Sequence, residues 1–111
     1  MLEYLFANKN VEKILYFLFL HGKCHASELS KCFDSALDPI QKTLLKLEWG
    51  GLLVSFSEGK TRIFEWNPRY PFLKEVQNLS KKMGEFLPEE IKERYYLSTK
   101  RKRPRKTGKP L

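Results

Sequence analysis

Two histidines and two cysteines within a short stretch are the side chains of this sequence best suited to metal chemistry: His21, Cys24, His25 and Cys32. Thiolate and imidazole are the ligands that zinc prefers. Their spacing is not that of a structural zinc module, and Cys32 lies beside Leu29 and Phe33, where a free thiol packs as a small apolar group. We therefore expect neither a metal ion nor another cofactor.

Covalent catalysis is also not indicated. No serine or cysteine stands in a recognisable nucleophile motif, and the acidic residues are scattered along the chain. We expect a protein that is not an enzyme. Two cysteines are too few to staple a small secreted fold, which predicts a reduced, cytoplasmic protein. The most apolar run, residues 14–20, is too short to cross a bilayer, so we interpret it as a buried helix and expect no membrane partner.

Polyanion binding is the chemistry that the charge favours. The 111 residues, enough for one domain, carry 21 basic and 13 acidic side chains, a net charge of +8. Seven bases and no acid lie in residues 98–111, a segment without apolar periodicity, whereas residues 1–97 are nearly neutral. We predict a disordered basic tail at 98–111 whose arginines bind phosphate, namely Arg101, Arg103 and Arg105. Acidic protein, RNA and a merely solubilising role remain alternatives for this tail.

Three helices are predicted in the first half of the chain. Asn10 is a candidate N-cap for a helix over 11–20, which His21-Gly22 ends. Ser27 caps a short helix that continues to Phe33, and Asp38-Pro39 starts a third that ends at Trp49, before two glycines.

A hairpin and a further helix follow. Residues 52–57 and 61–66 are β-prone runs around a central glycine, which predicts two antiparallel strands. A helix over 72–87 carries apolar residues at spacings of 4, 3, 4 and 3, and a short helix follows over 89–97. The apolar seam of the longer helix can pack on its own chain or on a second copy. The tight spacing favours a homodimer through Phe72, Val76, Leu79, Met83 and Phe86.

This order of elements resembles the winged helix-turn-helix transcriptional regulators, particularly their arsenic-repressor-like (ArsR-like) group. The resemblance covers about residues 5–75 and rests on three stretches: ASEL at 26–29, KLEWGGLL at 46–53 and SEGKTRIFEWNP at 57–68. It implies an α+β domain over 1–97, with a three-helix core, a hairpin called the wing and an extra C-terminal helix. It also implies a dimer that binds duplex DNA and regulates transcription. That group includes metal sensors with a Cys-x-Cys pair, which this chain lacks.

The helix over 38–49 is the one expected to read DNA. At 100° per residue, Ile40, Leu44 and Leu47 cluster within about 60° and form the core face. Lys42, Lys46 and Trp49 then face outward, with Gln41 and Thr43 at the flanks. Glutamine can pair with adenine, and lysine, arginine and threonine can bind base edges or phosphates. The predicted body contacts to DNA are therefore Gln41, Lys42, Thr43 and Lys46 of this helix and Lys60 and Arg62 of the wing.

Two alternatives remain open. Residues 23–66 contain six bases and six acids, so the predicted DNA-binding module has no net charge. Leu45 and Trp49 on its outer face suit a protein contact, which favours a protein-interaction adaptor on the same fold. Binding to nucleic acid through the basic tail alone, without sequence preference, is the other alternative.

Overall fold

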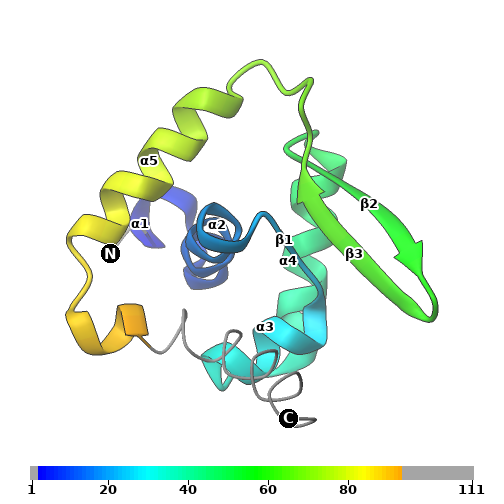
Figure 1. Ribbon diagram of the computed structural model, residues 1–111, viewed down its shortest axis with the longest axis horizontal. Helices are drawn as coiled ribbons and strands as arrows, with labels where there is room; N and C mark the ends of the chain where they lie inside the picture. Colours follow the sequence, from blue (N-terminus) through cyan, green and yellow to red (C-terminus); the bar gives the residue numbers. More distant parts are fainter. Residues whose placement is uncertain (1–2, 94–111) are drawn as a thin grey trace, which may run out of the picture.

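The computed structural model describes residues 3–93 (Figure 1). In chain order the elements are α1 (Glu3–Phe6), α2 (Lys9–His21), β1 (Lys23–Cys24), α3 (Ala26–Phe33), α4 (Leu37–Trp49), β2 (Leu53–Glu58), β3 (Thr61–Trp66) and α5 (Leu73–Glu85). A further helical turn begins at Glu89, after Pro88. The predicted α+β class, the hairpin and the C-terminal helix are confirmed. The basic tail lies outside the described residues.

The helices begin at other residues than predicted. The Asn8 side chain, not that of Asn10, caps α2: Asn8 Oδ1 accepts a hydrogen bond from the Asn10 backbone N–H at 2.8 Å. At the start of α3 the cap is His25 rather than Ser27, and the Glu28 carboxylate accepts from the His25 backbone N–H at 3.4 Å. In both helices a nearby side-chain oxygen accepts a hydrogen bond from a backbone N–H at the helix start. The sequence contains two candidate capping residues at the start of each helix.

A three-stranded antiparallel sheet holds the hairpin to the body. Its strand order is β1-β3-β2, so β3 lies in the middle. The two-residue strand β1 was not predicted; Lys23 pairs with Glu65, and Cys24 pairs with Phe64. The preceding Gly22 adopts a φ of +82°, which a residue without a Cβ reaches easily, and its N–H bonds to the Leu18 carbonyl. This turn sends the chain from α2 directly to the edge of β3.

Helix α2 forms the centre of the core. Figure 1 shows it between α1 and α5 on one side and α3, α4 and the sheet on the other. Five consecutive residues, 14–18, are buried. A helix with other elements on both sides buries more than one face, which explains the continuous apolar run in its sequence.

Helix α5 packs on α2 of its own chain. Met83 is buried in the core and Val76 packs against it, whereas Phe72 and Phe86 remain exposed. The predicted apolar seam is therefore divided between core and solvent, and Leu79 is half-buried. Met83 cannot contribute surface to a dimer, which corrects the interface predicted from the spacing alone.

Every helix within residues 3–93 is too short or too polar to span a bilayer.

Candidate nucleic-acid interface

The outer face of α4 carries both polar and apolar exposed side chains. Ile40 and Leu44 are fully buried and Leu47 packs against the core, so the predicted core face is confirmed. The opposite face exposes Gln41, Lys42, Leu45, Lys46 and Trp49. Trp49 is 91% exposed and Leu45 is 45% exposed. Together with the exposed Asp38 carboxylate, this helix thus offers an amide, two ammonium groups and two apolar side chains to a partner.

Thr43 does not belong to this face. It is only 3% exposed, and its hydroxyl donates to the Pro39 carbonyl at 2.9 Å. The side-chain amide of Asn8, a residue just before α2, donates to the Thr43 hydroxyl oxygen at 3.4 Å. Thr43 flanks the core stripe on the helical wheel, and the segment before α2 covers it. The prediction that Thr43 contacts DNA is therefore incompatible with its position, and we remove it from the candidate contacts.

A groove separates α4 from the hairpin. Its volume is about 430 Å³, and it is bordered by the start of α3, by one stripe of α4 and by β3 with the preceding turn. The stripe consists of Leu37, Gln41 and Leu45, four residues apart, which is the spacing of one helix face. Lys60 and Arg62 border the groove from the hairpin. The structure therefore brings Gln41, Lys60 and Arg62 around one hollow, although they are far apart in sequence.

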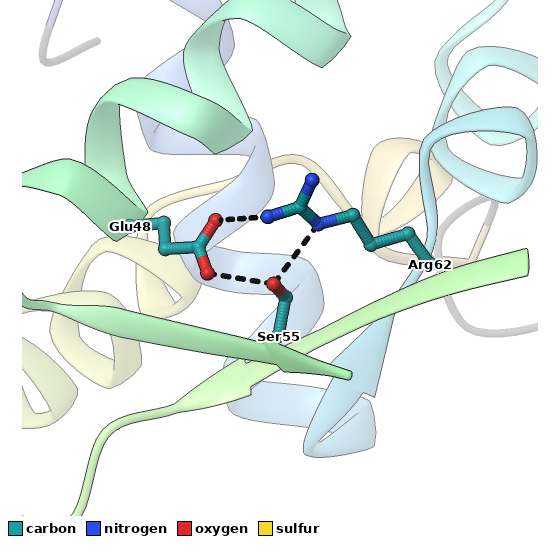
Figure 2. Close-up of polar contacts among 3 residues, drawn as sticks. All are labelled: Glu48, Ser55 and Arg62. Atoms are coloured by element: carbon teal, nitrogen blue, oxygen red, sulfur yellow. Dashed lines mark hydrogen bonds and ion pairs between the residues drawn. The ribbon is translucent and has the colours of Figure 1, made fainter. Parts of the chain in front are cut away.

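Arg62 is held in a closed ring of hydrogen bonds with Glu48 and Ser55 (Figure 2). Its Nη2 donates to Glu48 Oε1 at 2.9 Å, and its Nε donates to Ser55 Oγ at 2.9 Å. The Ser55 hydroxyl donates to Glu48 Oε2 at 2.6 Å, and the Arg62 guanidinium also lies over the Phe64 ring, 5.5 Å from its centroid. The ring connects the last turn of α4 to both strands of the hairpin.

Carboxylates pair with half of the cations on the outer side of α4 and on the hairpin. Lys42 Nζ lies 3.1 Å from Asp38 Oδ2 on the preceding turn, and Arg62 is paired with Glu48. Within the described part of the chain, Lys46 and Lys60 form no such ion pair. Residues 3–93 as a whole contain thirteen basic and thirteen acidic side chains. We define the α4–wing face as the outer side of α4, including Glu48, together with the hairpin of residues 53–66; its charges are balanced rather than basic.

The histidine and cysteine cluster does not form a metal site. Cys24 and Cys32 are both buried. Burial raises the pKa of the Cys24 thiol far above its ordinary value, and the nearby Glu28 carboxylate raises it further, so the thiol stays protonated. No group of three or more potential ligands among residues 3–93 is placed to hold a metal ion.

Glu48 and Ser55 were not predicted as part of the candidate site. Glu48 lies seven residues after Gln41 and so shares its side of α4, which was visible in the sequence. Its contact with Arg62, fourteen residues later, depends on how the hairpin folds back on α4. Arg101, Arg103 and Arg105 lie outside the described residues.

Comparisons of this chain with protein-family models, with curated proteins and with solved structures find no match.

Proposed function

We propose that this protein binds duplex DNA through the α4–wing face and regulates transcription in a sequence-specific manner. The observation that supports it best is the exposure of Gln41, Lys42 and Lys46 on one side of α4, next to the groove that Lys60 borders. An α-helix of 13 residues is about 20 Å long, and the major groove, about 12 Å wide, admits such a helix. The winged helix-turn-helix resemblance agrees with this function.

Each side chain has a distinct role in this proposal. Gln41 faces the base edges, where its amide can pair with adenine. Lys46 and Lys60, which have no carboxylate partner in the described part, bind phosphates. Lys42 contributes less to phosphate binding, because Asp38 already attracts its ammonium group. The basic tail adds affinity without sequence information.

The proposed active form is a homodimer. After the correction above, the side chains available for contact along α5 are the exposed Phe72 and Phe86 with the half-buried Leu79. A two-fold dimer would present its two α4 helices to successive major grooves, about 34 Å apart, and would require a palindromic site.

Selection of binding sequences from random duplexes tests the proposal. The full chain and a chain shortened by residues 98–111 should both recover the same palindrome. The double variant Gln41→Ala, Lys42→Ala should lose that preference, whereas Gln77→Ala, Lys81→Ala, which removes the same side-chain types from α5, should keep it. Loss of all binding on removal of 98–111 would support binding through the tail alone and contradict our proposal.

A second candidate function is protein binding by the same face. Trp49, which is 91% exposed at the end of α4, is the observation that favours it, because tryptophan is enriched at the centres of protein interfaces. In an adaptor, Trp49→Ala would abolish capture of a protein partner while any DNA binding survived. A wild-type chain that selects no DNA sequence, together with a Trp49-dependent partner, would favour this function over the first.

A further inference from the structure

We propose that Glu48 weakens sequence-independent binding of DNA to the α4–wing face by occupying Arg62. This inference rests on the proposed DNA binding and assigns a role to a residue that makes no base contact itself. Glu48 acts through Arg62, so it is a positioning residue of the α4–wing face.

The geometry of the ring leaves Arg62 without one of its phosphate-binding edges. Arginine binds phosphate and carboxylate in the same way, through neighbouring N–H groups on its planar guanidinium. In this structure Nη2 and Nε, which form one edge of the guanidinium, already donate to Glu48 and Ser55. Figure 2 shows the third nitrogen pointing away from both partners. A phosphate that needs this edge must displace a carboxylate that already satisfies it.

Displacement is unfavourable because Glu48 would be left near the DNA without a cation. Its side chain is 26% exposed, compared with 55% for Arg62, so water solvates the released carboxylate only in part. The ring therefore imposes a penalty on any complex that relies on a phosphate contact made by Arg62. Complexes with non-target DNA consist almost entirely of phosphate contacts, whereas target DNA also offers base edges to Gln41.

The other ion pair of the face is a weaker candidate for this role. Asp38 and Lys42 are both far more exposed than Glu48, and a single contact of 3.1 Å joins them. Solvent and salt screen such a pair strongly. Glu48 is less exposed and is held by two hydrogen bonds, which makes it the carboxylate that competes best with phosphate.

The test compares binding of the full chain to a mixed-sequence duplex of 20 base pairs over a series of salt concentrations. The variants are Glu48→Gln, Arg62→Gln and the double variant. Glu58→Gln is the matched control, because Glu58 is exposed at the hairpin turn and has no ion pair within residues 3–93. The tail is common to all these proteins, so ratios between them report on the α4–wing face.

We expect Glu48→Gln to bind the mixed duplex about three- to tenfold more tightly, with a log-log salt slope steeper by about 0.9, one additional phosphate. In the Arg62→Gln background the same change should have no more effect than Glu58→Gln. Arg62→Gln alone should leave the slope unchanged, whereas Lys60→Gln should make it shallower by about 0.9. This last comparison does not depend on how Glu48→Gln folds.

Three results would overturn the inference: equal effects of Glu48→Gln and Glu58→Gln, an effect of Glu48→Gln that persists without Arg62, or a shallower slope for Arg62→Gln. Each of these leaves the proposed DNA binding intact. Failure of the wild-type chain to bind any duplex at low salt would instead overturn the proposed function, and this inference with it.

Discussion

Gly84 of α5 lies directly against the ring of Tyr16 of α2, so closely that a Cβ at position 84 would overlap ring atoms. This contact sets the distance between the two helices. Alanine normally stabilises a helix interior by about 1 kcal/mol relative to glycine. At this site the overlap must displace either the buried Tyr16 ring or α5 itself.

We therefore expect Gly84→Ala to lower the free energy of unfolding by about 1–3 kcal/mol, the usual effect of overpacking a core. Urea unfolding followed by circular dichroism measures it. Gly50→Ala is the matched control, because Gly50 has a helical φ of −76° and a Cβ there would meet only ordinary contacts. A Gly84→Ala protein as stable as wild type would show that α5 does not pack on α2 as described.

Removal of the Asn8 side chain should destabilise the protein more than removal of that of Asn10. Asn8 caps α2 and also contacts Thr43, and loss of a capping side chain lowers stability by about 1 kcal/mol. Thermal unfolding of Asn8→Ala and Asn10→Ala makes the comparison. If Asn10→Ala is the more damaging change, the cap predicted from the sequence is the correct one.

Thr43 and Gln41 should separate stability from DNA binding. Thr43→Val keeps the shape of a buried side chain but loses the hydroxyl bonded to Pro39, so we expect a loss of about 1 kcal/mol in stability and unchanged DNA affinity. Gln41→Ala on the exposed face should show the reverse. Unfolding experiments measure the stability of the two variants, and fluorescence anisotropy measures their affinity for DNA. A Thr43→Val protein that is stable but defective in DNA binding would return Thr43 to the contact surface.

Stability should fall above pH 8.5 because of Cys24. Burial raises the pKa of this thiol in the folded state, so in alkaline solution the unfolded chain loses the proton first and is favoured. The stabilising contribution of the protonated thiol is complete below the unfolded pKa of about 8.5 and decreases as the pH rises. The loss in the free energy of unfolding reaches about 1.4 kcal/mol at pH 9.5.

Urea unfolding between pH 7 and 9.5 measures this loss. Cys24→Ala should reduce the decline, whereas Cys32→Ala retains the Cys24 contribution. An identical pH profile for wild type and Cys24→Ala would contradict the burial argument.

Trp49 should report DNA binding by its fluorescence. It is almost fully exposed, whereas Trp66 is half-buried and donates from its indole N–H to the Leu18 carbonyl at 3.3 Å. We expect Trp49 to supply the longer-wavelength emission and to change when duplex DNA covers α4. Trp49→Phe should abolish the change and Trp66→Phe should preserve it. A response that survives Trp49→Phe would place the DNA elsewhere.

Local signals in the sequence predicted most of the elements. Apolar residues at helical spacing located α2, Asp38-Pro39 and the two following glycines located α4 to within one residue at its start, and the two β-prone runs around Gly59 located the hairpin. The core face of α4 was also correct for Ile40 and Leu44, because a helix has a fixed angular step and only one face can meet the body. These features depend on neighbours in the sequence, so the sequence determined them.

Tertiary structure decided the features that depend on distant residues. Cys24 is part of a strand because it pairs with Phe64. Thr43 flanks the core stripe of its helix and is buried because the segment before α2 covers it. Helical periodicity could not decide whether α5 meets its own chain or a second copy, since an apolar stripe fits either.

The ring of Glu48, Ser55 and Arg62 is the clearest case. The sequence shows one carboxylate on a helix and one arginine on a hairpin. Only the folding of the hairpin against α4 turns this net-neutral pair into a contact that regulates access to Arg62, because electrostatic pairing depends on distance in space and not on order along the chain.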